Sequence, residues 1–241
     1  MIDFSPGHKK DGAVVLFITG TDTSVGKTLI CSLLLGFFLD RDFKAICQKW
    51  VSTGGENPDD FFYIFQNNNL DPGETPLDIL APYCFSPAVS PHLAAEEAGR
   101  PIDPEVIKKC LAQARANSEV LLVEGTGGLH VPLSRNLLLV DLVAQLELPV
   151  LLVARSGLGT LNHTLLTIES LENRGMSLLG IVFSDEQHYE PADPLVNDNM
   201  RTIKEITGFS ILGRLPRCAD YQEAGLAFRT IGEKLLRILL A

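Results

Sequence analysis

The 241-residue chain has few aromatic side chains, a shortage of positive charge and no long hydrophobic run. Aromatic residues make up 7% of it, and 20 Lys and Arg stand against 30 Asp and Glu, which gives a net charge of −10. This excess of acid excludes the basic surfaces with which proteins bind nucleic acid or an anionic membrane. The longest apolar stretch, 29–39, is interrupted by Cys31, Ser32 and Gly36 and is shorter than the ~18 residues of a membrane-spanning helix. We therefore expect no nucleic-acid partner and no membrane span.

Cysteine is also scarce. The five cysteines are odd in number and form no C-x-x-C pair: Cys31, Cys47, Cys84, Cys110 and Cys218. Residues 1–12 are polar and lack the apolar segment of a signal peptide. We expect reduced, mostly buried thiols and a cytoplasmic protein.

Short apolar runs alternate along the chain with longer segments of helical periodicity. Five runs predict strands, and a weaker sixth follows at 210–215; the five are 13–19, 45–51, 120–123, 149–154 and 178–183. Helices are predicted at 27–39, 104–116, 139–146, 161–174, 197–207 and 221–240. This alternation predicts an α/β fold, a mostly parallel sheet with helices on both faces. No linker divides the chain, so we expect one domain over 1–241.

Residues 54–101 interrupt this alternation. They are rich in Pro, Gly, Asn and Asp, and their strand signals are poor or absent. We expect an excursion beside the sheet with a short helix at 60–66 and a loop at 82–91. The sequence Ser90-Pro91-His92 is more typical of a turn that enters a helix than of a functional site, so His92 is not a catalytic candidate.

The first predicted strand ends in GTDTSVGKT, residues 20–28, and a predicted helix follows at once. Strand, Gly-rich turn, Gly-Lys-Thr and helix are the context of a phosphate-binding P-loop. Backbone N–H groups at the helix start bind polyphosphate, Lys27 reaches the terminal phosphates and the Thr28 hydroxyl ligates Mg²⁺. The loop therefore predicts ATP binding by an acidic chain. Gly20 stands one position before the consensus glycine, and Asp22 replaces the second lysine of the partitioning ATPases, which disfavours that class.

Two polar residues lie at the ends of predicted strands, at the sheet edge where open α/β sheets bind ligands. Lys49 lies close to the end of the second strand, where a solvated surface lysine is the alternative. Glu124 directly follows the predicted third strand, where an acid is costly unless it is paired or binds a metal ion. Because a P-loop lies nearby, Mg²⁺ is the expected partner of Glu124.

The loop GTDTSVGKT resembles that of the dethiobiotin synthetases, and four further motifs follow in the order of that family. Residues 49–54 (KWVSTG) are similar to Lys-Pro-Val-x-Ser/Thr-Gly, with Trp50 in place of proline. Residues 86–92 (SPAVSPH) resemble its Pro-x-x-Ser-Pro-His element, and 123–128 (VEGTGG) its VEGAGG. Residues 157–163 (GLGTLNH) are similar to its G-x-x-G-x-Ile/Leu-N-H. The resemblance runs from about residue 14 to 216.

The resemblance implies a set of site residues. The catalytic residues would be Lys49, Lys27 and Thr23, and the Mg²⁺ ligands would be Thr28, Asp60 and Glu124. Asp59 is the alternative to Asp60 as the second carboxylate ligand. Either of these two acids could instead be the N-cap of a helix. The substrate would contact Thr53 and, with help from the partner subunit of a homodimer, the helix start at Gly159, Thr160, Leu161 and Asn162. The nucleotide would contact Ser24, Val25, Gly26, Lys27, Thr28, Leu29, Asp60, Glu124, Gly125, Thr126, Gly127, Ser184, Asp185, Pro216, Arg217 and Cys218.

The resemblance also implies a reaction. Members of the family use MgATP, CO₂ and 7,8-diaminopelargonate to make dethiobiotin, ADP and phosphate, through a carbamate and a carbamic-phosphoric mixed anhydride. Two alternatives stay open, a non-catalytic P-loop nucleotide switch and a cobyrinate-type amide ligase. The second normally carries a glutaminase domain, for which we expect no room in 241 residues.

The nucleotide-base region departs from the family pattern. The family usually has Asn-Asp after its fifth strand, where the asparagine reads adenine, and this chain has Ser184-Asp185. A serine hydroxyl cannot supply the paired donor and acceptor of an amide. The sequence therefore predicts relaxed use of other nucleoside triphosphates.

Overall fold

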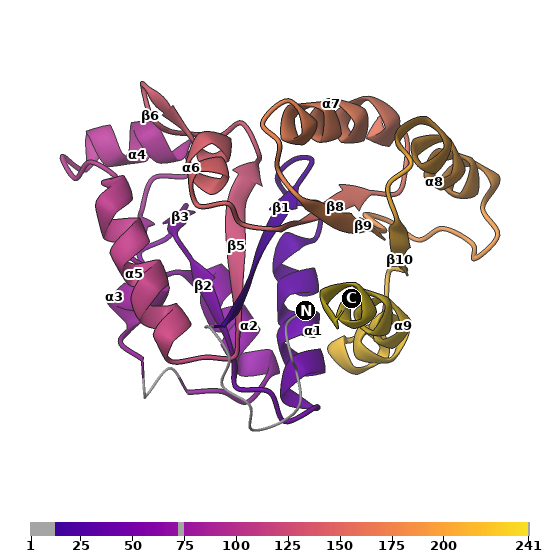
Figure 1. Cartoon of the computed structure of the whole chain (residues 1–241), viewed down its shortest axis with the longest axis horizontal. Coiled ribbons are helices and arrows are strands. Elements are labelled where there is room, and N and C mark those ends of the chain that lie inside the picture. The colour runs from indigo at the N-terminus through magenta and orange to yellow at the C-terminus, as the bar shows by residue number, and fades with distance from the viewer. Residues whose placement is uncertain (1–12, 72–74, 241) are drawn as a thin grey trace.

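A computed structural model describes residues 13–71 and 75–240 of the chain (Figure 1). The polar segment 1–12, which carried the expectation of no signal peptide, lies outside the described residues. Among the helices described, none is long and apolar enough to cross a membrane.

Six strands of the described residues form a sheet in the order β10-β9-β8-β1-β5-β2, and every neighbouring pair runs parallel. The strands are β1 (Val14–Gly20), β2 (Ala45–Lys49), β5 (Val120–Gly128), β8 (Val150–Arg155), β9 (Leu178–Ser184) and β10 (Ile211–Leu215). The predicted mostly parallel α/β sheet is thus confirmed, including the weak sixth strand. Because the strands are parallel, their carboxyl ends meet at one edge, where the P-loop follows β1.

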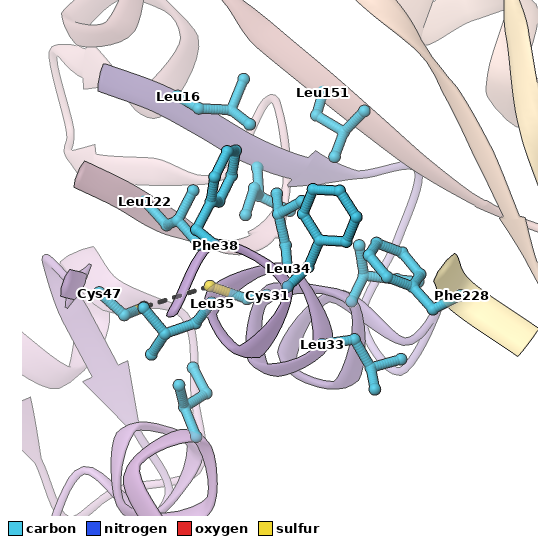
Figure 2. Packing of buried hydrophobic residues seen from close by; sticks show 14 of the residues in the cluster. Leu16, Cys31, Leu33, Leu34, Leu35, Phe38, Cys47, Leu122, Leu151 and Phe228 are labelled. Carbon is cyan, nitrogen blue, oxygen red and sulfur yellow. Dashed lines mark hydrogen bonds between the residues drawn. The ribbon is translucent and has the colours of Figure 1, made fainter. Parts of the chain in front are cut away.

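Helices cover both faces of this sheet, so alternate residues of β1 enter different cores. Leu16 and Ile18 pack with α1 (Lys27–Leu39), α2 (Asp59–Asn67) and α9 (Tyr221–Leu240). Figure 2 shows this core, with Phe38 and Phe228 beside Leu16 and Leu151 of the sheet.

Phe17, which lies between Leu16 and Ile18 on β1, packs on the other face of the sheet with α5 (Pro104–Ala116) and α6 (Leu139–Gln145). A third cluster joins β8 and β9 to α7 (Thr160–Glu172) and α8 (Pro194–Thr207). Burial on both faces explains why these strands read as continuous apolar runs.

The start of α8 differs from the prediction. The helix begins at Pro194 rather than residue 197, because Asp193 caps it by accepting hydrogen bonds from the backbone N–H groups of Leu195 and Val196 at 3.0 and 3.1 Å. Proline at the first helical position suits this start, since its missing N–H would have no partner there.

The predicted strand 45–51 is wrong as a single element. β2 stops at Lys49, and β3 (Val51–Thr53) pairs with β4 (Tyr83–Phe85) in a separate two-stranded sheet. Trp50 marks the bend: its buried ring lies 5.5 Å from that of Phe17, and its carbonyl accepts the Tyr83 N–H. From Trp50 onward, the backbone therefore pairs with the excursion rather than with β5.

The excursion 54–101 contains more regular structure than the sequence predicted. The short helix predicted at 60–66 is confirmed as α2, but the segment 82–91, predicted as a loop, contains β4. Two short helices also lie here, α3 (Leu77–Leu80) and α4 (Pro91–Glu97). The expected turn into a helix at Ser90-Pro91 is confirmed, because α4 begins at Pro91.

β5 is longer than the predicted strand 120–123 and carries Glu124 within it rather than after it. Glu124 lies opposite Ile18 of β1, and Gly128 lies opposite Gly20 after a bulge. Gly125 permits this path, because a Cβ there would lie 2.9 Å from the Phe17 ring. A small hairpin that the sequence did not predict follows, β6 (Pro132–Ser134) with β7 (Leu137–Leu138).

All five cysteines lie within the described residues and are free thiols. Cys31, Cys47 and Cys110 are buried, while Cys84 and Cys218 are partly exposed. The prediction of mostly buried cysteines is therefore confirmed, and their reduced state stays a prediction.

Candidate active site

A cleft of about 790 Å³ opens where β1, β2 and β5 end. It is lined by Thr23, Ser24, Gly26, Lys27, Thr28, Leu29, Lys49, Thr53, Asp59, Asp60, Tyr63, Glu124, Thr126 and Gly127. The cleft thus brings together the predicted catalytic residues, the predicted Mg²⁺ ligands and most of the predicted phosphate-binding residues.

Gly26 shapes the P-loop at the start of α1. Its φ of 95° lies in the left-handed region, and a Cβ there would lie 2.5 Å from the Ser184 hydroxyl oxygen. Only glycine satisfies both conditions without strain. No side chain caps α1 within the described structure, so its first N–H groups remain directed at the cleft, where an anion is favoured.

Lys27 is buried beneath the loop. Its Nζ donates a hydrogen bond to the Asp22 carbonyl at 2.8 Å. Burial lowers the pKa of Lys27 from 10.5 to about 8, because the attraction of Glu124 only partly offsets the loss of hydration. A phosphate group that replaced this lost hydration would stabilise the charged ammonium.

Lys49 lies between two carboxylates. Its Nζ donates to Glu124 Oε1 at 2.9 Å and to Asp60 Oδ2, and the Thr28 hydroxyl donates to the same Glu124 oxygen at 2.8 Å. Burial by itself lowers the pKa of Lys49, but the charges of Glu124 and Asp60 outweigh it and raise that pKa above its usual value. Lys49 therefore keeps its positive charge at neutral pH.

The oxygen atoms around Lys49 fit a hard divalent cation. Glu124 Oε2 is buried and has no hydrogen-bond partner in the described part of the chain. The Thr28 hydroxyl contacts the same carboxylate, and the Asp60 side chain is half exposed. Mg²⁺ is typically held by one or two carboxylates together with phosphate oxygens and water. Asp60, rather than Asp59, reaches Lys49; an Asp59 oxygen lies instead near Gly55.

Some of the other predicted site residues line the cleft, and others are buried beneath its surface. Thr53, Thr126 and Gly127 line the cleft, and the Thr126 hydroxyl donates to the Val51 carbonyl. Val25 is buried beneath the P-loop, and Gly125 packs against Phe17. These last two positions support the loop and the strand rather than the cleft surface.

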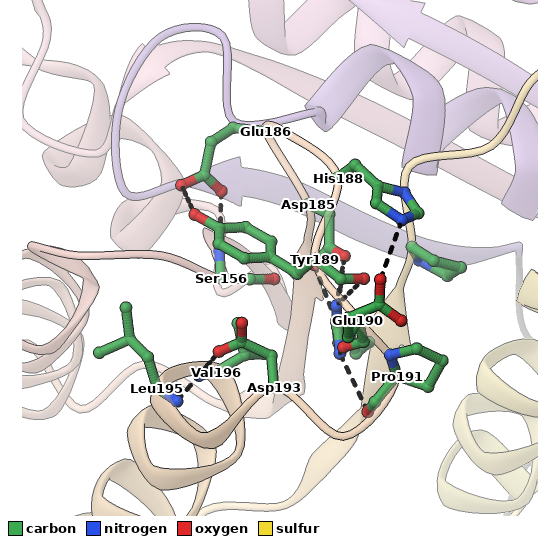
Figure 3. Close-up of polar contacts among 12 residues, drawn as sticks. Ser156, Asp185, Glu186, His188, Tyr189, Glu190, Pro191, Asp193, Leu195 and Val196 are labelled. Atoms are coloured by element: carbon green, nitrogen blue, oxygen red, sulfur yellow. Dashed lines mark hydrogen bonds and ion pairs between the residues drawn. The ribbon is translucent and has the colours of Figure 1, made fainter.

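The predicted nucleotide-base residues lie beyond the P-loop, on the β9 and β10 side. The Ser184 hydroxyl lies beside Gly26, and Pro216 and Arg217 are exposed after β10, next to the partly exposed Cys218. The Asp185 carboxylate is fully buried against Arg214, with Nη2 and Oδ2 2.7 Å apart. Figure 3 shows Asp185 within the loop that follows β9. Its side chain is thus engaged within the protein.

The predicted substrate-carboxylate residues do not line the cleft of their own chain. Gly159 to Asn162 form the start of α7, where Gly159 has a φ of 90° and no side chain caps the helix in the described structure. Leu158, just before them, is 84% exposed. Within one chain, the described structure therefore leaves this helix start outside the lining of the cleft that holds Lys49.

Sequence reasoning missed two residues near the cleft. Tyr63 lines it from α2, and Arg155 contacts Asp22 from the end of β8, with Nη2 and Oδ2 2.9 Å apart. The sequence offered one sign that Arg155 could belong to the site: it follows a predicted strand, at the sheet edge where ligands bind.

Relatives of known name match most of the chain. The ATP-dependent dethiobiotin synthetase BioD of Clostridium novyi (strain NT) is 34% identical over 220 residues, 85% of this chain and 88% of that protein. That of Anaeromyxobacter sp. (strain Fw109-5) is 39% identical over 211 residues, 86% of this chain and 92% of that protein. The chain belongs to the dethiobiotin synthetase family. A sequence profile described as an AAA domain also matches residues 15–224.

This dethiobiotin synthetase family is one of ATP-dependent ligases, so the predicted family and enzyme class are confirmed. The two alternatives, a nucleotide switch and a cobyrinate-type ligase, are not favoured. Solved structures show the fold alone. The MinC:MinD cell division complex of Aquifex aeolicus aligns with TM-score 0.59 at 15% identity, covering 95% of this chain and 96% of that one. Cobyrinic acid a,c-diamide synthase of Mycobacterium smegmatis, with ADP and magnesium, aligns with TM-score 0.58 at 16% identity over the same shares.

Proposed function

We propose that the chain closes the cyclic urea of dethiobiotin from 7,8-diaminopelargonate, CO₂ and ATP, releasing ADP and phosphate. The observation that carries this proposal is the position of Lys49. Its ammonium lies in one cleft with Lys27, Thr28 and Glu124, where a phosphoryl group and its acceptor would meet. Lys49 together with Glu124 favours retained chemistry over a nucleotide switch.

The chemistry runs in three steps. The lone pair of one amine forms a bond to the carbon of CO₂, and the amine loses a proton, which leaves a carbamate. A carbamate oxygen then bonds to the γ-phosphorus while the bond from that phosphorus to the β–γ bridging oxygen breaks, which releases ADP. The second amine bonds to the carbamate carbon and loses a proton, and phosphate departs with the electrons of its bond to carbon.

The residues of the cleft supply position and charge for these steps, which phosphoryl transfer chiefly requires. The amides at the start of α1 and Lys27 would hold the β- and γ-phosphates. Lys49 would stabilise negative charge on the carbamate and on the phosphoryl group as it moves. Thr23 and Thr53, which line the cleft, would donate hydrogen bonds to carbamate or phosphate oxygens.

Thr28, Asp60 and Glu124 would hold Mg²⁺. When bound, the ion supplies neutralisation of the charge on the phosphate oxygens. The unpartnered Glu124 Oε2 supports this assignment, because a buried carboxylate oxygen without a partner is costly.

The start of α7 would receive the substrate's carboxylate in the cleft of a partner subunit, in a homodimer. Two observations support this: Gly159 to Asn162 do not line their own cleft, and the apolar Leu158 beside them is exposed. Relaxed selectivity for the nucleotide base also belongs to the proposal, since Ser184 lacks an amide and the Asp185 carboxylate is bound to Arg214.

The proposal is tested by ADP release with diaminopelargonate and bicarbonate, measured with each component omitted in turn. We expect release to need the diamine, bicarbonate and Mg²⁺ together. ADP release at the same rate without the diamine would overturn the ligase assignment.

A further inference from the structure

Asp22 organises the first half of the P-loop through its backbone and its side chain. Its carbonyl accepts a hydrogen bond from Lys27 Nζ at 2.8 Å. Its carboxylate oxygen Oδ1 accepts one from the Thr23 N–H at 2.7 Å and a longer one from the Thr23 hydroxyl at 3.4 Å. The placement of Lys27 and Thr23, both assigned to phosphate or carbamate oxygens, thus depends on the placement of Asp22.

Arg155 anchors Asp22 to the neighbouring strand. It is the last residue of β8, and its Nη2 donates to Asp22 Oδ2 at 2.9 Å. The backbone is joined at the same place, because the Thr21 N–H donates to the Val153 carbonyl at 3.0 Å. Arg155 Nε is buried without a partner, so within the described structure the Asp22 carboxylate is the acceptor of this guanidinium.

The charge of Asp22 is a problem for a loop that binds polyphosphate. A carboxylate beside the phosphates repels them, unless a cation compensates it. Arg155 supplies that cation, in a pair whose side chains are 30% and 45% exposed. Pairs this exposed stabilise a fold little. The contact therefore matters for the shape and charge of the loop more than for folding.

We propose that Arg155 is a positioning residue of the ATP-dependent reaction. It neutralises Asp22 and holds the loop so that Lys27 and Thr23 face the phosphates, without touching the substrate itself. This role rests on the ligase function proposed above.

Arg155→Ala tests the role. We expect kcat/KM for ATP to fall about 10- to 100-fold, the range that a misplacement of about 1 Å produces. The melting temperature should fall by no more than ~2–4 °C, because the pair is exposed. Methylguanidinium added to the assay should restore part of the activity of Arg155→Ala, and Arg155→Lys should lie between the two. A merely structural role would not give rescue by a small cation.

Arg41→Ala is the matched control. Arg41 pairs with Glu233 at the far end of α1, with side chains 28% and 42% exposed, close to those of the Arg155 pair. It also packs on the Phe37 ring, so its loss should cost at least as much stability. We expect wild-type kcat/KM for ATP in this variant.

Asp22→Asn and the double variant Asp22→Asn with Arg155→Ala complete the cycle. If Arg155 acts through Asp22, the two losses are not additive, and the double variant is no worse than Arg155→Ala. Unchanged kcat/KM in Arg155→Ala, losses that multiply in the double variant, or an equal loss in Arg41→Ala would overturn the proposal.

The nucleotide-binding step separates this proposal from the ligase function. If the wild-type chain shows no diamine-dependent turnover, the ligase proposal fails, and calorimetry with MgADP still tests Arg155. Weaker MgADP binding by Arg155→Ala, restored by methylguanidinium, supports its role, and wild-type binding overturns it.

Discussion

Replacing Lys49 by methionine separates what this lysine does for the fold from what it does for the reaction. The Lys49 and Glu124 side chains are 4% and 1% exposed and pair at 2.9 Å. Removing one partner leaves a buried, uncompensated charge, which costs about 3–5 kcal/mol. For a chain of this length the melting temperature then falls by roughly 6–20 °C. Asp60 adds little to this sum, because its side chain is 49% exposed.

The same substitution removes a charge from the proposed transition state. Loss of one such electrostatic stabiliser lowers kcat about 10²- to 10³-fold. Urea unfolding followed by circular dichroism measures the first effect, and ADP release under conditions where the variant is folded measures the second. Lys49→Met and Lys49→Gln keep most of the bulk of the side chain, so comparing them with Lys49→Ala distinguishes loss of charge from loss of bulk.

A compensating variant makes the reasoning refutable. Adding Glu124→Gln to Lys49→Met removes both charges, and replacing a buried pair by neutral groups is often close to neutral for stability. We expect the double variant to regain most of the lost stability while kcat stays low. If Lys49→Met had the same urea midpoint of unfolding as the wild-type chain, the account of the buried pair would be refuted. A wild-type kcat would remove Lys49 from the mechanism.

Three further predictions concern the metal ion, the loop and the base. Glu124→Gln should weaken Mn²⁺ binding in the presence of ADP by at least ~10-fold, which is what the loss of an outer-shell partner of a metal ion costs. Electron paramagnetic resonance measures this binding, and wild-type affinity would exclude Glu124 as a ligand. Gly26→Ala should lower the free energy of unfolding in urea by ~1–3 kcal/mol and weaken ADP binding. The reasons are the φ of 95° at this position and the Ser184 hydroxyl oxygen, which would lie 2.5 Å from the new Cβ. Full ADP affinity would contradict this. Ser184 predicts comparable kcat/KM with ATP, GTP and CTP; a strong preference for ATP would count against it.

Local patterns in the sequence were sufficient for much of the fold and the loop. The strand before Gly20 and the helix from Lys27 follow from periodicity and from the fixed spacing of a P-loop, and both are observed. Asp60, rather than Asp59, reaches Lys49, and the choice of Asp60 as the Mg²⁺ ligand stays a prediction. Where neighbours in sequence determine the geometry, prediction succeeded.

Long-range packing determined the rest. The bend at Trp50 depends on Phe17 and on a partner strand that begins 33 residues later in the chain, at Tyr83. The ion pair of Asp22 with Arg155 joins residues 133 positions apart, and neither stands in a pattern that names the other. The Asp185 carboxylate was assigned to the nucleotide, yet its partner Arg214 belongs to the next strand. Such contacts become visible only once the sheet order is known.

The transfer of an oxygen atom tests the central claim, that this cleft phosphorylates a carbamate of the diamine. With ¹⁸O-labelled bicarbonate, diaminopelargonate and MgATP, mass spectrometry of the released phosphate reports which oxygen attacked the γ-phosphorus. A phosphorylated carbamate predicts one labelled oxygen in each phosphate, formed together with dethiobiotin. Unlabelled phosphate from a reaction that yields dethiobiotin would contradict the account.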